Sequence, residues 1–563
     1  MSNLFSPPPH TLKSRSLKRL CVGVAALTVL VSANAFAGVP YVKAEKPITD
    51  KDGRVKVIID FKYDAHLKYP GALPVVPARD VLAKPTTFFL SEKTLALASD
   101  YERRYGFERT GMTSWVGNSV TAFVSADTVA KLLDDPLVTQ VSDDTENSFS
   151  QMPAGGWQNT ASGNEWTSWG HQAVNGKIST GNTGRKIYII DGGVAYHDDL
   201  PSMVRRNVAC GASGECAVNN PYSYSVVACY AHATHVAGII GAIAGNGKTM
   251  KGAYAGFPNL VSLSVLTRTG TLNCGDTAPT TSAIGYALDY IAFDATQNNP
   301  NQLVHVATMS INPGGAFIYP TGQQGPNWQK IQSLTTTIWA YGVPVVPGVF
   351  FVQSSGNDGL PIPYSTCDWA YSPNTTNVAS SSDGVMVVGA SHHDGGAVTP
   401  NRPFSSFAPG ASFPNYDSPT STFPYSQGGT VTWANSESCV DIFAPGDLIL
   451  STWGIHANVS PVEYAGGVAN TLNTPWMNYS GSVAFPVVYG SHSSTPAPTQ
   501  GWAFLSGSSM AAPFVAAAAA WLADVYGYTT PGALEQAVRA NITYAVDPMV
   551  SPPIPPVPVV RLP

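Results

Sequence analysis

A chain of 563 residues, 12% of them charged and 44% hydrophobic, is too long for one ordinary domain and apolar enough to bury a large core. Its formal net charge of −6 excludes the strong basic excess of a nucleic-acid-binding protein, because phosphate recognition needs clustered lysine and arginine. We therefore expect at least two globular domains and no nucleic-acid partner.

The first 37 residues have the pattern of a secretory signal peptide. Four basic residues and no acidic residue precede or flank an apolar run at residues 20–31, and the small residues Ala35 and Ala37 follow it. The run is shorter than the roughly 20 residues that a membrane span needs, which weighs against the alternative of a short membrane anchor. We expect cleavage after Ala37, a secreted protein, and no membrane span once the signal peptide is removed.

Charge density divides the remainder of the chain near residue 150. Thirty of the 113 residues from 38 to 150 are charged, whereas only 32 of the 413 residues from 151 onward are charged. The second segment is poor in charge and rich in apolar residues, so we expect it to form one large folded unit. The predicted organisation is a signal peptide (1–37), a first module (38–150), a main domain (151–547) and a proline-rich tail with little regular structure (548–563).

The first module is predicted to be a small α+β unit. Its periodicity indicates strands at 55–59, 119–125 and 138–141 and helices at 91–104 and 127–133. The stretch SVTAFVSADTVAKLLDDPLVTQVSDD resembles the inhibitory prosegments of subtilisin-like proteases, in which a strand, a helix and a second strand lead to an acidic stretch. This resemblance implies an inhibitory propeptide. A module with some other binding role is the alternative.

The main domain is predicted to be an α/β unit with a mostly parallel sheet. Short continuous apolar runs alternate with helix-like stretches, which is typical of parallel strands buried on both faces. The predicted strands lie at 186–190, 260–266, 304–311, 343–352 and 385–388, and the predicted helices at 236–244 and 282–296. Residues 458–500 show no clear period and are expected to form long surface loops.

Three motifs of the main domain carry the chemistry: KIYIIDGGVAYHDDL around Asp191, CYAHATHVAGIIGA around His232, and LSGSSMAAPFVAAAAAWLA around Ser509. Together they resemble the signatures of the subtilisin family, in which the order along the chain is Asp, His, Ser. The resemblance implies a doubly wound, mostly parallel sheet with helices on both faces, preceded by the small α+β prodomain. It also implies a secreted serine endopeptidase that is processed by itself from a precursor.

Each residue type of the predicted catalytic triad has a chemical task. Ser509 would attack a peptide carbonyl and form an acyl-enzyme, while the imidazole of His232 accepts its proton. Asp191 would fix the tautomer of His232 and stabilise the imidazolium. The neighbours His235 and Ser508 are the alternatives, and the alignment with the family motifs assigns structural roles to both of them.

The resemblance also assigns an oxyanion hole and a substrate-binding region. The side chain of Asn357 and the backbone at Ser509, at the start of a helix, would stabilise the oxyanion. Pro513 would lie in the first turn of that helix. An extended peptide would bind by strand addition along two segments, which comprise Ser310, Ile311 and Asn312, and Ser354, Ser355 and Gly356.

Two departures from the family pattern lie beside the predicted triad. Gly192 follows Asp191 where the family usually has serine or threonine, and Ala233 follows His232 in place of glycine. These changes keep open the alternative of a weak homologue that binds peptides. An ester or lipid hydrolase is disfavoured because the nucleophile segment ends in Ala511, and the triad order also differs from that fold.

Six cysteines follow the signal peptide, and an even number in an exported chain favours disulfides. Counting alone allows 15 pairings. Resemblance to the proteinase K and aqualysin branch implies the pairs Cys229–Cys274 and Cys367–Cys439, which leaves Cys210 and Cys216 as the third pair. We expect a monomer whose partners are protein or peptide substrates and its own propeptide. The chemistry requires no cofactor, and a structural calcium ion is left open, with Asp441 as the candidate ligand.

Overall fold

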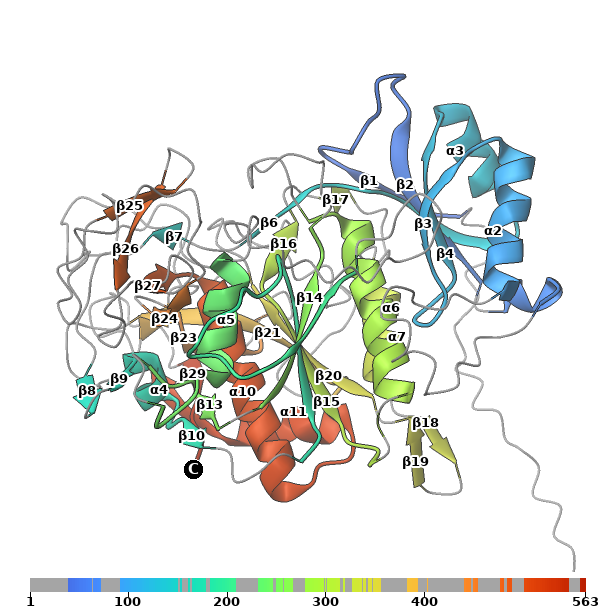
Figure 1. Cartoon of the computed structure of the whole chain (residues 1–563). Coiled ribbons are helices and arrows are strands. Elements are labelled where there is room, and N and C mark those ends of the chain that lie inside the picture. Colours follow the sequence, from blue (N-terminus) through green and yellow to red (C-terminus); the bar gives the residue numbers. More distant parts are fainter. Residues whose placement is uncertain are drawn as a thin grey trace, which may run out of the picture. The chain divides into compact units, whose positions relative to one another are not determined.

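The structure is a computed structural model of the whole chain (Figure 1). The residues that it describes are 39–62, 64–71, 92–149, 152–153, 160–162, 165–178, 183–208, 231–246, 250–256, 258–266, 279–297, 299, 301–313, 317–318, 327–336, 338–340, 343–346, 348–355, 382–392, 402–403, 440–446, 449–453, 476–479, 483–488, 501–545 and 557–563. The predicted signal peptide and all the cysteines therefore lie outside the described residues.

The first module is built on a sheet of order β17-β1-β5-β2-β4-β3. Its own strands are β1 (Tyr41–Ala44), β2 (Val55–Phe61), β3 (Arg109–Thr113), β4 (Ser119–Val124) and β5 (Val138–Asp143). Helices α2 (Glu92–Tyr105) and α3 (Ala126–Leu133) accompany them, together with the short helix η1 (Ala65–Lys68). The predicted strands and helices of this module are confirmed, whereas β1 and β3 were not predicted. Strand β17 (Phe317–Ile318) comes from the main domain.

The module has its own hydrophobic core. Leu97 and Tyr101 on α2 and Ile59 on β2 are fully buried in one cluster, which follows from the apolar face of an amphipathic helix packing against a sheet. Helix α3 begins after Ser125, whose hydroxyl accepts a hydrogen bond from the backbone N–H of Thr128. The module therefore contains the local signals and the buried surface of a folded unit.

The main domain is built on a larger sheet of order β12-β14-β11-β15-β20-β21-β23-β29-β28, with β22 pairing β21. All neighbours from β12 to β29 run parallel, and β28 and β22 are antiparallel. The strands are β11 (Lys186–Asp191), β12 (Val204–Asn207), β14 (Asn259–Ser264), β15 (His305–Met309), β20 (Val349–Ser354), β21 (Val385–His392), β22 (Arg402–Pro403), β23 (Ile442–Pro445), β28 (Ile542–Ala545) and β29 (Val557–Val560). The predicted mixture of α and β structure with parallel strands is confirmed.

Alternate residues of β11 belong to two different hydrophobic clusters. Ile187 and Ile189 pack in the cluster that includes helices α5 (Ala231–Gly241) and α10 (Ser508–Tyr526), while Tyr188 and Ile190 pack in the cluster that includes α6 (Thr281–Gln297) and α7 (Trp328–Thr335). Side chains of a strand point alternately to opposite faces. Both faces of β11 are therefore buried, and Figure 1 shows α5 and α10 on one side of the sheet and α6 and α7 on the other.

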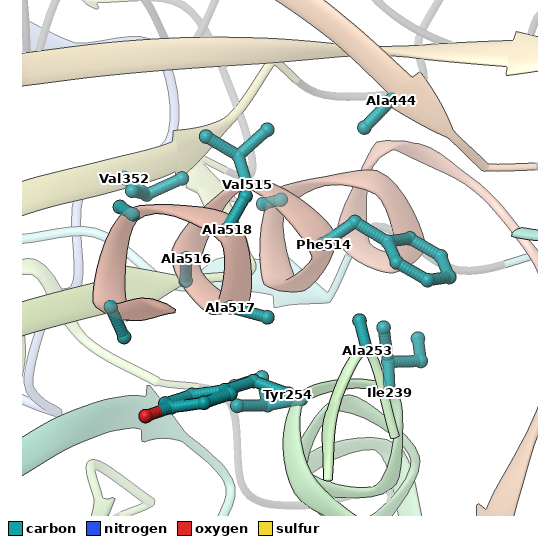
Figure 2. Close-up of a cluster of buried hydrophobic side chains, with 14 of the residues drawn as sticks. Ile239, Ala253, Tyr254, Val352, Ala444, Phe514, Val515, Ala516, Ala517 and Ala518 are labelled. Carbon is teal, nitrogen blue, oxygen red and sulfur yellow. The ribbon is translucent and has the colours of Figure 1, made fainter. Parts of the chain in front are cut away.

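Helix α10 is the central helix of the first face. Val515 is directed toward Val352 of β20 and Ala444 of β23, whereas Ala517 faces Tyr254 (Figure 2). The small alanines let this helix approach both the sheet and α5 closely. It is the one helix among the described residues that is long and apolar enough to span a membrane, and most of it is buried inside the protein. Its composition is therefore explained by its place in the core.

The end of the proline-rich tail differs from its prediction. Strand β29 pairs antiparallel with β28 and parallel with β23, so it is part of the main sheet. Val559, Val560 and Leu562 are buried, so the apolar residues between the prolines pack into the core beside β23 and β28. Composition alone predicted a tail with little regular structure, since proline is rare in strands, but proline is tolerated where a ladder hydrogen bond is not needed.

Several smaller elements complete the described part of the main domain. Helix α4 (Trp169–Ala173) packs in the α10 cluster, and α11 (Pro531–Ala540) follows α10. A second sheet has the order β24-β27-β26-β25, with β7 pairing β27. The remaining strands include β6 (Asn147–Phe149), β7 (Met152–Pro153), β8 (Thr160–Ser162), β9 (Glu165–Thr167), β10 (Lys177–Ile178), β13 (Tyr254–Ala255), β16 (Ile311–Pro313), β18 (Ile338–Ala340), β19 (Val343–Val346), β24 (Ile449–Trp453), β25 (Trp476–Tyr479), β26 (Val483–Val488) and β27 (Gly501–Ser506).

Polar side chains connect the first module to helices α6 and α7. The carboxylate of Asp289 on α6 accepts hydrogen bonds from the backbone N–H groups of Ser114, Trp115 and Val116. Asp144 accepts hydrogen bonds from the backbone N–H and the hydroxyl of Ser282, at the start of α6.

A buried ion pair adds to these contacts, because Lys330 Nζ on α7 lies 2.7 Å from Asp60 Oδ1 on β2. The interface thus contains several buried charges, each of which has a partner on the other side.

Candidate functional site

Three of the predicted site residues lie at one edge of the parallel sheet. Asp191 is the last residue of β11, Ser310 follows β15, and Ser355 follows β20. The register places Ile190 beside Met309 and Met309 beside Gln353, so the three strands end at the same level. Ligands of open parallel sheets bind at this carboxyl edge.

Asp191 and His232 form a close pair. His232 Nδ1 lies 2.9 Å from Asp191 Oδ2 and 3.0 Å from Asp191 Oδ1, and both residues are buried. The backbone N–H of Gly192 also donates to Asp191 Oδ1, at 2.6 Å. A backbone donor therefore supports the aspartate at the position where the sequence lacks the hydroxyl of the family pattern. The arrangement suits a carboxylate that holds an imidazole in one orientation.

Helix α5 positions His232 and is fixed to strand β24. His235, one turn after His232, lies with Nε2 3.0 Å from the carbonyl oxygen of Ile449. The hydroxyls of Ser451 and Thr452 donate to the carbonyls of His235 and Thr234. Helix and strand approach so closely that a Cβ at Gly238 would lie 2.3 Å from both hydroxyl oxygens. The second histidine thus anchors the helix, in agreement with its predicted structural role.

Ser509 is the second residue of α10 and is fully buried. Gly507 precedes the helix with φ of 141°, a conformation that favours glycine, and its N–H donates to the carbonyl of Gly446. In this structure Ser509 Oγ donates to the carbonyl oxygen of Ser310 at 3.1 Å. The helix start therefore places Ser509 beside the segment predicted to bind substrate.

Ser310 contacts Ser509 a second time, through its own side chain. Its hydroxyl donates to the carbonyl oxygen of Ser509 at 3.1 Å, and both residues are buried. Pro513 explains why this carbonyl is available: proline has no N–H, so the usual i to i+4 helical bond from Pro513 to Ser509 cannot form. Pro513 lies inside α10 and not in its first turn as predicted. The sequence contained both residues, but only the fold brings Ser310 to the carbonyl that Pro513 leaves open.

The segment predicted to bind an extended peptide is paired with another strand of the chain. Strand β16 (Ile311–Pro313) runs antiparallel to β6 (Asn147–Phe149), with Asn312 opposite Ser148. Strand β6 lies immediately before the charge boundary near residue 150. The segment at β16 therefore already binds an added strand, which is β6 of the same chain.

The structure places some of the other predicted site residues and not all of them. Ser354 and Ser355 are buried at the end of β20, and the N–H of Ser355 donates to the carbonyl of Val388. Gly356 and Asn357 lie outside the described residues, as do the six cysteines of the predicted disulfides: Cys210, Cys216, Cys229, Cys274, Cys367 and Cys439.

The carboxylate of Asp441, the candidate calcium ligand, accepts hydrogen bonds from nitrogen donors. Its carboxylate accepts hydrogen bonds from the N–H of Val387 and from the guanidinium of Arg539. Glu535 lies on the other side of Arg539, and burial raises the pKa of both carboxyls. Within the described ranges no group of three or more His, Cys, Asp or Glu side chains could hold a metal ion. The donor set at Asp441 therefore does not fit calcium.

Comparisons with known proteins add a family to this geometry. Residues 182–552 match the model of the subtilase family, Peptidase_S8. No curated protein matches the chain. Among solved structures, the chain is similar to fervidolysin from Fervidobacterium pennivorans, described as a keratinolytic enzyme related to subtilisin, with 14% identity and a TM-score of 0.47. That match covers 90% of this chain and 60% of the fervidolysin chain.

Two other solved structures are similar over most of their own length. A protein described as S41 psychrophilic protease is 19% identical, with a TM-score of 0.38, and the match covers 66% of this chain and 89% of that one. A cold adapted subtilisin-like serine proteinase is 20% identical, with a TM-score of 0.35, and the match covers 70% and 97%. The family match spans more than half of the chain and contains Asp191, His232 and Ser509. The chain therefore belongs to the subtilase family of peptidases.

Proposed function

We propose that this chain is a secreted serine endopeptidase with Asp191, His232 and Ser509 as its catalytic triad. The observation that carries the proposal is the buried Asp191–His232 pair at the carboxyl edge of the sheet, together with Ser509 at the start of α10 beside Ser310. The family match supports the same reaction class.

The proposed reaction begins when Ser509 Oγ leaves the carbonyl of Ser310 and donates its proton to His232. The hydroxyl oxygen attacks the peptide carbonyl, and Asp191 stabilises the imidazolium that forms. His232 then returns the proton to the leaving amine, which leaves an acyl-enzyme that water hydrolyses. Backbone N–H groups at the start of α10 and the side chain of Asn357 would stabilise the oxyanion.

The substrate is proposed to bind as an extended strand along β16. Main-chain hydrogen bonds give such binding its affinity, so many sequences are accepted and side-chain pockets decide the preference. The β6–β16 pair supports this mode, because residues 147–149 already take the position of such a strand.

The first module is proposed to be an inhibitory propeptide in a self-processed precursor. Its strand β6 covers the segment proposed for substrate, and the charge boundary near residue 150 follows directly. The doubly wound arrangement of the main domain, the disulfide pairs and secretion after cleavage at Ala37 belong to the same proposal.

The decisive test compares Ser509→Ala with Ser508→Ala in the full chain. Ser509→Ala is expected to abolish casein hydrolysis and to accumulate with residues 38 to about 150 still attached by a peptide bond, whereas Ser508→Ala still matures. A serine-directed phosphonate should label the unchanged protein at Ser509 alone.

Three results would count against the proposal. A Ser509→Ala protein of mature mass from a protease-free host would refute self-processing. Labelling at Ser508 would refute the choice of nucleophile. Peptide binding without hydrolysis by the unchanged protein would favour an inactive homologue.

A further inference from the structure

A second contact between the first module and the proposed substrate-binding segment lies just beyond β16. Residues 314–316 separate β16 from β17 (Phe317–Ile318), and β17 pairs antiparallel with β1 (Tyr41–Ala44). The register places Lys43 opposite Ile318 and Ala44 opposite Phe317. On its other edge β1 runs parallel to β5. A segment of the main domain is thus the outer strand of the module's own sheet.

The strand β1 is firmly attached to the module. The hydroxyl of Tyr41 donates to Asp143 Oδ1 at 2.6 Å, and the N–H of Ala44 donates to Asp143 Oδ2 at 2.9 Å. Val42 is fully buried in the cluster that also contains Ile311 of β16. Both the backbone and one apolar side chain of β1 therefore contribute to contacts across the module boundary.

The direction of the Ala44 N–H identifies the residue that faces β17. Backbone polar groups of successive strand residues point to opposite neighbours. Because the Ala44 N–H points to Asp143 at the β5 side, the backbone of Lys43 points to β17. The Lys43 side chain is exposed, so a substitution there can remove the backbone donor without disturbing the buried residues.

We propose that residues 41–44 form a strand clamp, which holds the main-domain segment 311–318 from its far end while β6 holds it at β16. This inference rests on the proposed function, because it treats the first module as an inhibitory propeptide. After the chain is cut near residue 150, β6 and β1 are still joined to the module, so the module leaves only when β1 separates from β17. The clamp therefore sets the delay between cleavage and full activity.

The clamp is tested first by its effect on this delay, in the full chain. Lys43→Pro removes the N–H that faces β17, and Lys43→Thr is the matched control, which keeps that N–H and favours a strand. Cleavage is followed by gel, and activity by hydrolysis of a peptide substrate. Lys43→Pro is expected to shorten the delay about 5- to 10-fold, the equivalent of about one hydrogen bond, with an unchanged delay for Lys43→Thr. Activity per titrated active site is expected to stay the same, because the mature enzyme no longer contains residue 43.

Hydrogen exchange in the uncleaved Ser509→Ala chain is the second measurement. Lys43→Pro should lower amide protection at Ile318, which lies opposite residue 43, and leave it unchanged at Ile311 and Asn312, where β6 remains paired. Equal delays for the proline and threonine variants, or unchanged amide protection at Ile318, would overturn the clamp.

If Lys43→Pro does not fold, Val42→Ala replaces it in the same experiment. It should also shorten the delay between cleavage and full activity. If neither variant yields folded Ser509→Ala protein while Lys43→Thr does, β1 is required for folding and the clamp is refuted. A chain that is never cut and never active would instead refute the proposed function, and hydrogen exchange would still decide whether β1 protects β17.

Discussion

The main domain makes two kinds of contact that differ in chemistry, one between its own α5 and β24 and one between α6, α7 and the first module. The face with α5 and α10 is filled with small apolar residues, and its close contacts leave no space for one additional carbon at Gly238. The face with α6 and α7 carries the first module through buried charges such as Asp289 and Lys330. Close apolar packing suits a permanent contact that positions catalytic residues. Charged groups can be solvated again when a partner leaves, so they suit a contact that must be broken.

The largest effect is expected from Asp289→Ala, which should weaken the binding of the first module to the main domain. The substitution leaves the N–H groups of Ser114, Trp115 and Val116 without their acceptor. Burial raises the pKa of Asp289 to about 7, so we count each of the three bonds at about 0.5 to 1.5 kcal/mol. We expect the module to bind weaker by about 4 kcal/mol, and the mature enzyme to melt at an unchanged temperature. Calorimetric unfolding of the precursor and of the mature enzyme measures both. Asp289→Asn, which keeps one oxygen acceptor, should give an intermediate value. Equal losses in both forms would mean that Asp289 serves the main domain alone.

Gly238→Ala tests the close packing of α5 against β24. The new carbon would meet Ser451 Oγ, Thr452 Oγ1 and the Thr452 backbone, so α5 must move away from β24. Overpacking of this kind costs about 1 to 3 kcal/mol. Precursor and mature enzyme should lose the same stability, and kcat should fall because His232 moves with the helix. Thermal unfolding in the Ser509→Ala background gives the stability. If the variant lost stability only in the precursor and not in the mature enzyme, the α5–β24 contact would depend on the first module, which would contradict this distinction.

A buried cluster of Asp441, Glu535 and Arg539 in the main domain predicts a loss of stability as pH rises toward 8. Burial raises the pKa of Asp441 to about 7 and that of Glu535 to about 8, so the folded state holds protons that the unfolded chain releases above about pH 4. Stability therefore falls as pH rises from about 4 to about 8. Melting of the Ser509→Ala protein between pH 5 and 9 measures this loss, and Glu535→Gln should flatten the curve. A melting temperature that rises across this range would contradict the assignment.

Ser310→Ala is expected to have the smallest effect. It removes the donor to the Ser509 carbonyl that Pro513 leaves without a helical partner, at a cost of about 1 kcal/mol. A positioning role predicts a fall in kcat of about fivefold with KM nearly unchanged, because the substrate contacts of the Ser310 backbone remain. Ser310→Thr should restore most of the rate. A rise in KM alone would instead assign Ser310 to substrate binding.

The sequence by itself determined the elements and the chemistry that depend on local pattern. Three strands and two helices of the first module, the parallel strand that ends at Asp191, and the helix start at Ser509 follow from periodicity and from short motifs. These features are set by residues within a few positions of one another, so a single sequence contains them. Helix α5 begins at Ala231, before the predicted start at 236.

Only the tertiary structure decided which distant residues meet. The pairing of β1 with β17, the three N–H groups that donate to Asp289, and the contact of Ser310 with Ser509 join positions up to 275 residues apart in the sequence. The strand in the proline-rich tail was missed for the same reason, because its stability comes from β23 and β28 and not from its own composition. Pairing of this kind depends on backbone hydrogen bonds and burial, which are supplied by the partner segment and leave no pattern in either sequence alone.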